Sequence, residues 1–258
     1  MNSPVLSTPA QPVLVSLAAT ATTETLAETV IAFAVLDGLL EAIEWANDGV
    51  AADEPACMWL STLRWVRAFD GSVPEGAPES PARWTDAHFR AIAAALTSED
   101  REEVSVHPDT QSLRLPEMST PSRPFARKRG PETDYENDDA VQLSLRSFVL
   151  ALLPDADGTL IRRLTRDAAA LTHGAEASYS FAQSVGAWAN ALFWPELHSA
   201  NNVPHDRPTM GAYATQVETA QASLQEPGGV VVRSENPAHE ALLKFATELA
   251  QRWDQAAA

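Results

Sequence analysis

The chain has 258 residues, of which 45% are hydrophobic and 21% charged, enough for one large domain or two small ones. Asp and Glu number 35 against 18 Lys and Arg, so the formal net charge is −17. Such an acidic surface repels DNA phosphates and anionic membranes, so we expect no nucleic-acid partner and no membrane partner. Cys57 is the only cysteine, which excludes disulfide scaffolds and cysteine-based zinc sites.

The first two dozen residues contain a short apolar run, residues 12–21, but no Lys or Arg precedes Arg64. A secretory signal peptide carries a basic segment before its apolar run, and a transmembrane helix needs about 20 apolar residues. We therefore interpret residues 1–25 as a flexible leader and expect a cytoplasmic protein. The remaining residues, 26–258, are predicted to form a single domain.

After the leader, apolar residues recur at spacings of three and four, which is typical of an amphipathic helix. The apolar face of the first helix carries Leu26, Val30, Phe33, Leu36, Leu40 and Ile43. Glu28, Glu41 and Glu44 are expected elsewhere on the helical wheel. The helix should end near residues 47–49, where Gly49 can adopt the left-handed conformation of a helix cap.

Two more helices are predicted before residue 97. Asp53 is expected to cap the second helix, and residues 71–82, which hold three prolines, are predicted to be a loop. Thr85 is expected to cap the third helix. Trp84 and Phe89 are placed to form a hydrophobic staple across its start.

Hydrophobic periodicity disappears between residues 97 and 137, and we interpret this whole segment as one long central loop. It is polar and holds five prolines. It also carries a short basic run made of Arg123, Arg127, Lys128 and Arg129. A loop this long inside a compact domain is commonly functional or disordered.

Helical periodicity returns in the second half of the chain. The predicted helices cover residues 140–153, 159–173, 175–193 and 211–224, and Pro237 opens a last one that reaches Trp253. Gly174 is expected to cap the helix that ends at His173. Residues 228–232 are the only fragment with the character of a strand. The pattern as a whole predicts an all-α fold.

Residues 168–176 stand out, because one helix ends on Thr172-His173-Gly174 and the next begins almost at once. This segment resembles the Ala-Leu-Thr-His-Gly corner of the ADP-ribosylglycohydrolase family. In that family the corner follows a helix entered from a glycine-rich loop that binds ADP-ribose. Here Leu145-Arg146-Ser147 resembles the Met-Arg-Ser end of that loop. Residues 26–70 and 136–192 carry the resemblance.

The resemblance implies a multi-helix orthogonal bundle with a ligand-binding site for ADP-ribose. The residues at the family's ligand-binding positions are Asp138, Asp139, Arg146, Ser147, Thr172, His173 and Gly174. Asp138 and Asp139 take the place of small residues that approach the diphosphate in the family. Because carboxylates repel a diphosphate, this exchange weakens the expected ADP-ribose site.

The family hydrolyses glycosidic bonds to ADP-ribose with two magnesium ions, which require oxygen ligands from two acidic motifs. The first motif falls on Leu26-Ala27-Glu28-Thr29, so only Glu28 and Thr29 keep a metal-binding oxygen. Glu28 is also the one remaining catalytic candidate. No second acidic motif occurs between residues 174 and 258.

Three functions stay open at this point. We favour a catalytically degenerate relative without a cofactor, which binds a partner or an ADP-ribose-like ligand. The residues of the helical core match the family, whereas the residues at its metal and nucleotide motifs do not. An active hydrolase of ADP-ribosylated proteins would keep Mg²⁺ or combine Glu28 with Asp37, Asp138 or Asp139, since two carboxylates can cleave a glycosidic bond without metal. The third possibility is an unrelated helical bundle.

Overall fold

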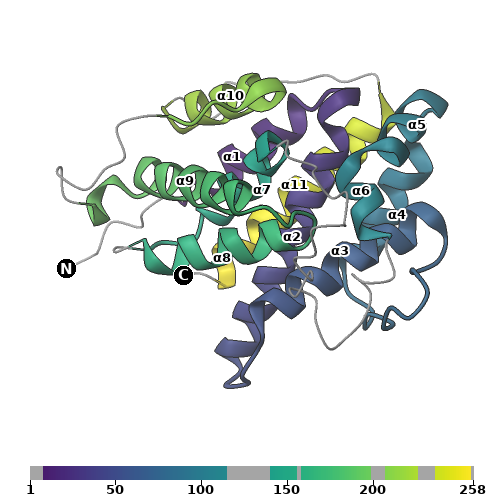
Figure 1. The fold of residues 1–258 in the computed structure, drawn as a ribbon, viewed down its shortest axis with the longest axis horizontal. Coiled ribbons are helices and arrows are strands. Elements are labelled where there is room, and N and C mark those ends of the chain that lie inside the picture. Colours follow the sequence, from purple (N-terminus) through teal and green to yellow (C-terminus); the bar gives the residue numbers. More distant parts are fainter. Residues whose placement is uncertain (1–7, 115–139, 156–157, 199–206, 226–235, 257–258) are drawn as a thin grey trace.

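A computed structural model describes residues 8–114, 140–155, 158–198, 207–225 and 236–256, and the regular elements in these ranges are helical (Figure 1). The helices are α1 (Ala10–Ala19), α2 (Thr23–Asn47), α3 (Glu54–Asp70), α4 (Thr85–Ala95), α5 (Ser98–Val106), α6 (Pro108–Leu113), α7 (Ser144–Leu150), α8 (Thr159–Ala170), α9 (Glu176–Phe193), α10 (Ala214–Gln225) and α11 (Pro237–Ala256), with short 3-10 helices at Ala140–Leu143, Pro195–Leu197 and Gly211–Tyr213. The predicted all-α fold is confirmed. None of these helices combines the length and apolar character that crossing a membrane requires.

Helix α2 runs through the centre of the molecule, and its residues 25–42 are all buried. Helices α3, α5, α7 and α11 pack around it. A helix enclosed in this way exposes no polar face over most of its length. Glu28 and Glu41, which the sequence places away from the apolar face on the helical wheel, are therefore also buried, and both side chains form ion pairs.

The close packing of α2 on α3 depends on Gly38. A Cβ atom at this position would lie 2.4 Å from the Cα of Met58, closer than real Cβ atoms approach a backbone. Any side chain here would push the two helices apart. The first predicted helix therefore contains a glycine that is required for packing, not for a turn.

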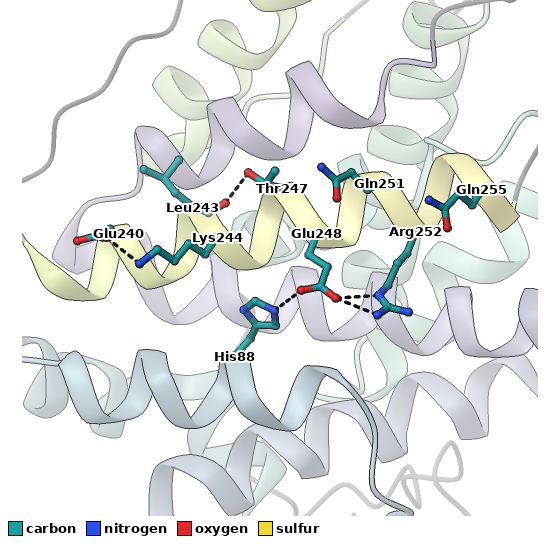
Figure 2. Close-up of a pocket in the computed structure, with 9 residues that line it drawn as sticks. All are labelled: His88, Glu240, Leu243, Lys244, Thr247, Glu248, Gln251, Arg252 and Gln255. Atoms are coloured by element: carbon teal, nitrogen blue, oxygen red, sulfur yellow. Dashed lines mark hydrogen bonds and ion pairs between the residues drawn. The ribbon is translucent and has the colours of Figure 1, made fainter.

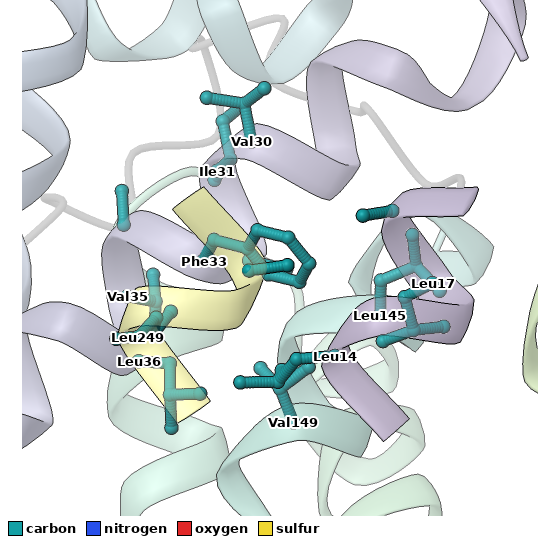
Figure 3. Close-up of a cluster of buried hydrophobic side chains, with 14 of the residues drawn as sticks. Leu14, Leu17, Val30, Ile31, Phe33, Val35, Leu36, Leu145, Val149 and Leu249 are labelled. Atoms are coloured by element: carbon teal, nitrogen blue, oxygen red, sulfur yellow. The ribbon is translucent and has the colours of Figure 1, made fainter. Parts of the chain in front are cut away.

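The apolar core joins the two ends of the chain around α2 (Figure 3). Leu14 and Leu17 of α1, Phe33 of α2, Leu145 of α7 and Leu249 of α11 are all completely buried in it. Helix α1 packs against α10 and α11. The prediction of a flexible leader over residues 1–25 is thus wrong for α1, and residues 1–7 lie outside the described part. Burial of its apolar residues stabilises α1, although it has no charged residue at either end.

The predicted loop over residues 97–137 is wrong in its first part, because it contains α5 and α6. Thr97 caps α5, and its Oγ1 accepts a hydrogen bond from the backbone N–H of Asp100 at 3.1 Å. Val104 is the only buried hydrophobic residue of α5, so its sequence shows no apolar stripe. Residues 115–137, with the basic run, lie outside the described ranges.

Helix boundaries follow local capping chemistry at several predicted places. The side chain of Asp53 accepts from Ala56 N at 3.1 Å, and Gly49 after α2 has a φ of 76°, so both predictions are confirmed. The cap predicted at Thr85 is wrong, because Trp84 takes that position. The Trp84 ring lies against Phe245 of α11, with centroids 5.8 Å apart.

The helices predicted in the second half are confirmed as α7 to α11, with shifts of a few residues at their ends. Helices α8 and α9 pack against each other, and α9 also packs on α7. The predicted strand at residues 228–232 falls outside the described ranges. The corner after α8 thus lies beside Arg146 of α7, which also contacts the N-terminal part of α2 and the start of α6.

Candidate functional site

Three titratable side chains from separate segments, Glu28, Asp109 and His173, meet inside the protein around Arg146 of α7. Its Nε and Nη2 donate to the two carboxylate oxygens of Glu28 at 2.8 and 2.7 Å. Nη2 also donates to Asp109 of α6, and Nη1 donates to Thr172 at 2.8 Å. We call Glu28, Asp109, Arg146, Thr172 and His173 the Arg146 cluster; their side chains have essentially no exposed surface.

Local structure on both sides of the cluster directs side chains towards Arg146. Pro108 begins α6, and the backbone N–H of Asp109 donates to His107 Nδ1 at 3.3 Å. On the other side, Nδ1 of His173 lies 2.9 Å from Thr172 Oγ1 and 3.6 Å from Asp109 Oδ1. The start of α6 and the corner after α8 are therefore held together by their polar groups.

The cluster contains two carboxylates but only one guanidinium, and its pKa values reflect this imbalance. Burial raises the pKa of Glu28 to about 8, because Arg146 lowers it by less than burial raises it. Burial also acts to raise the pKa of Asp109, but Arg146 first, and then the neighbouring His173 and His107, lower it to about 2. The cluster therefore holds one proton on Glu28 near neutral pH.

The structure brings together four of the residues that the resemblance assigned to the site. Glu28, Arg146, Thr172 and His173 are in direct or shared contact. Among them, Glu28 was the predicted catalytic residue and the other three were predicted ligand-binding residues.

The other predicted site residues do not join this contact network. Ser147 is buried, and its Oγ has no hydrogen-bond partner among the described residues. Gly174 does not have a positive φ, so its predicted role as a left-handed helix cap is wrong. Asp138 and Asp139 lie outside the described residues.

Asp109 is a member of the cluster that the sequence analysis missed. It lies in the segment that was predicted to be a loop. The signal that could have revealed it is His107-Pro108-Asp109, because Pro in the first turn followed by an acidic residue is typical of a helix start.

The predicted magnesium ligands, Glu28 and Thr29, do not fit a divalent cation. Both oxygens of Glu28 face the guanidinium of Arg146, and a second positive charge there would be repelled. The hydroxyl of Thr29 donates to Thr25 O at 2.8 Å and lies 3.2 Å from the side-chain amide of Gln216. Leu26 and Ala27 belong to the apolar core. In the described ranges, no three His, Cys, Asp or Glu side chains form a group that could hold a metal ion.

A second group of ion pairs lies further along α2, towards the surface. We call Asp37, Glu41, Glu44, Arg64 and Arg83 the rim cluster. Arg83 donates to Asp37 at 2.8 Å and to Glu44 at 2.9 Å. Arg64 donates to both oxygens of Glu41, at 2.9 and 3.3 Å.

Asp37, one of the three acids that the metal-free hydrolase hypothesis offered as a partner for Glu28, does not pair with it. The two residues are nine positions apart on one helix, which is about 14 Å along its axis. This separation exceeds the spacing of the carboxyl pairs that cleave glycosidic bonds, which is about 5–9.5 Å. Instead, the Asp37 carboxylate accepts a hydrogen bond from Ser61 at 2.8 Å. Burial raises its pKa above the ordinary value, although Arg83 and Ser61 act to lower it.

An open groove of about 580 Å³ lies on the surface between α4 and α11 (Figure 2). His88 Nε2 lies 2.9 Å from Glu248 Oε2, and Arg252 donates to the other oxygen of Glu248 at 2.9 and 3.0 Å. None of the Arg146 cluster residues lines this groove. Its charged side chains are paired with one another and form no link to the buried site.

The fold and the site together define an all-helical protein whose chemically distinctive residues form a sealed internal charge cluster. Comparisons with protein-family models, curated proteins and solved structures found no match. The similarity to ADP-ribosylglycohydrolases therefore stays a prediction from the sequence.

Proposed function

We propose that this chain is a catalytically degenerate relative of the ADP-ribosylglycohydrolases that acts by binding a partner. One observation carries the proposal: Arg146 occupies both carboxylate oxygens of Glu28, the residue predicted to remain from the metal motif. A carboxylate held in this way is unsuited to Mg²⁺. The proposed function therefore requires no cofactor.

A protein partner is favoured over an ADP-ribose-like ligand by the state of Arg146. Its Nε, Nη1 and Nη2 atoms all donate to groups of the protein. A diphosphate would have to displace Glu28 or Asp109 from a side chain with 0% exposure. It would then face the displaced carboxylates, which repel it.

One observation favours the alternative, an active hydrolase of ADP-ribosylated substrates. The environments of Glu28 and Asp109 move their pKa values in opposite directions, to about 8 and about 2. A protonated acid beside an ionised carboxylate is the pairing used in glycoside hydrolysis. Such chemistry needs substrate access, and both side chains are completely buried.

Calorimetry and a hydrolysis assay distinguish the two functions. The full chain is titrated with ADP-ribose with and without MgCl₂, and release of ADP-ribose from ADP-ribosylated arginine and serine substrates is followed. We expect no release and no increase in binding with magnesium. The Glu28→Gln variant is the matched control, because it removes the ionisable group and keeps the shape. Release by the natural chain that Glu28→Gln abolishes would overturn the proposal and establish the hydrolase.

A further inference from the structure

The turn between α2 and α3 projects from the lower end of the molecule in Figure 1. The last turn of α2 and this connection each carry one large exposed apolar side chain. Trp45 is 43% exposed and Val50 is 53% exposed, and Val50 N donates to Trp45 O at 2.8 Å. We call residues 43–56 the hairpin tip. Exposed apolar residues scattered singly are ordinary, whereas Trp45 and Val50 lie five positions apart at one projecting end of the molecule.

The hairpin tip is held in one conformation by the contacts of its own backbone and side chains. Gly49 adopts the left-handed conformation that ends α2, and Asp53 caps α3. The side-chain amide of Asn47 donates to Ala256 O at 2.9 Å, which ties the tip to the end of α11. Because the tip is already ordered, a partner loses little conformational entropy in binding it.

The charged residues of the hairpin tip itself are all acidic. Residues 43–56 include Glu44, Asp48, Asp53 and Glu54 and no Lys or Arg. Glu44 and Glu54 receive hydrogen bonds from arginines elsewhere in the chain, whereas the carboxylate of Asp48 extends from an exposed position at the end of α2. Exposed apolar side chains beside the exposed carboxylate of Asp48 are complementary to an apolar pocket surrounded by Lys and Arg.

We infer that the hairpin tip binds a protein whose surface is basic and offers an apolar pocket to Trp45. This inference rests on the proposed function, since it names the partner class through which the degenerate protein acts. A second copy of the chain is disfavoured, because its net charge of −17 would bring acidic surfaces together. Nucleic acids and anionic membranes are repelled for the same reason. Tryptophan is enriched among the residues that contribute most to protein interfaces.

Site-specific photo-crosslinking in the cells that make the chain tests this inference. The crosslinking residue p-benzoylphenylalanine replaces Trp45 in one full-length chain and Val106 in a control chain. Val106 of α5 is also exposed and apolar, at 59%, and Glu102 is an exposed acid one turn before it. We expect one basic protein to be crosslinked at position 45 and not at position 106.

The partner identified by crosslinking is then purified, and its affinity for variants of the chain tests the role of charge and of the aromatic ring. We expect Trp45→Ala to weaken binding by about thirtyfold, which is the scale of an interface hot spot. Asp48→Lys should weaken it by about tenfold or more, while the matched Glu102→Lys leaves it unchanged. Position 48 ends a helix, where a positive charge is favourable, so the fold is retained, and circular dichroism checks it.

Several results would overturn the assignment of the hairpin tip. These are equal crosslinking at positions 45 and 106, crosslinking at neither position, capture of a second copy or of an acidic protein, and binding that Asp48→Lys does not change. None of these results concerns hydrolysis, so the ADP-ribose release assay remains the separate test of the proposed function.

Discussion

The Arg146 cluster and the rim cluster both begin on α2, yet they solve the problem of buried charge differently. In the Arg146 cluster, one guanidinium faces two carboxylates that have no exposed surface, and burial raises the pKa of Glu28 to about 8. In the rim cluster, three carboxylates share two arginines, and Glu44 is only partly buried. The comparison shows that burial raises the pKa of the deepest carboxyl in each cluster, Glu28 and Asp37, and that solvent reaches only the outer member of the rim cluster, Glu44.

The largest effect should come from removing the central cation. We expect Arg146→Met to lower the free energy of unfolding by about 3–5 kcal/mol, because it leaves Asp109 buried without its counter-charge. Denaturant unfolding followed by circular dichroism measures this loss. Arg163→Met is the control, since Arg163 pairs with Glu54 on the surface and should cost less than about 1 kcal/mol. Equal losses in the two variants would contradict the comparison.

The next effect concerns pH and the proton on Glu28. The ordinary pKa of 4.5 applies in the unfolded chain, and burial raises it to about 8 in the folded chain. Between these values the folded state holds a proton that the unfolded state has released. Stability from this group is therefore complete below pH 4.5 and falls as the pH rises to about 8.

Glu28→Gln should remove this fall, because the amide does not ionise. We expect the stability of the natural chain, relative to the variant, to drop on the order of 3 kcal/mol between pH 5 and pH 8. Urea unfolding at both pH values measures it. Parallel pH profiles for the two proteins would show that Glu28 ionises at an ordinary pKa.

The smallest effect should come from the rim cluster. We expect Arg83→Met to lower the free energy of unfolding by about 1–3 kcal/mol, because Asp37 still accepts from Ser61 and Thr85. Glu44→Gln should cost less than about 1 kcal/mol and become neutral at high salt. Thermal unfolding at low and high salt checks both, and a loss in Arg83→Met as large as in Arg146→Met would remove the distinction between the clusters.

The sequence predicted those helices whose apolar spacing or caps are strong. The C-terminal end of α2, the Asp53 cap and the start of α11 at Pro237 were predicted on local grounds, since each depends on residues a few positions apart. Helix α5 was missed because its sequence has no apolar stripe. Helix α1 was missed because its burial depends on α10 and α11, which lie at the other end of the chain.

The candidate site was predicted only in part. Glu28, Arg146, Thr172 and His173 were found through the resemblance, but their mutual contacts were not. Asp109 was missed together with its helix. Whether Glu28 faces a metal, solvent or an arginine depends on which helix packs against α2, and the local pattern does not contain that information.

The sequence by itself determined that the chain is helical, where most helices lie and that its net charge is strongly negative. These properties follow from composition, from the spacing of apolar residues and from capping groups, all of which act over a few residues. Only the tertiary structure decided that Glu28, Asp109 and Arg146 share one buried cluster, and that residues 25–42 of α2 are all buried. Those outcomes depend on which distant helices exclude water together, because burial sets both the strength of the ion pairs and the pKa values.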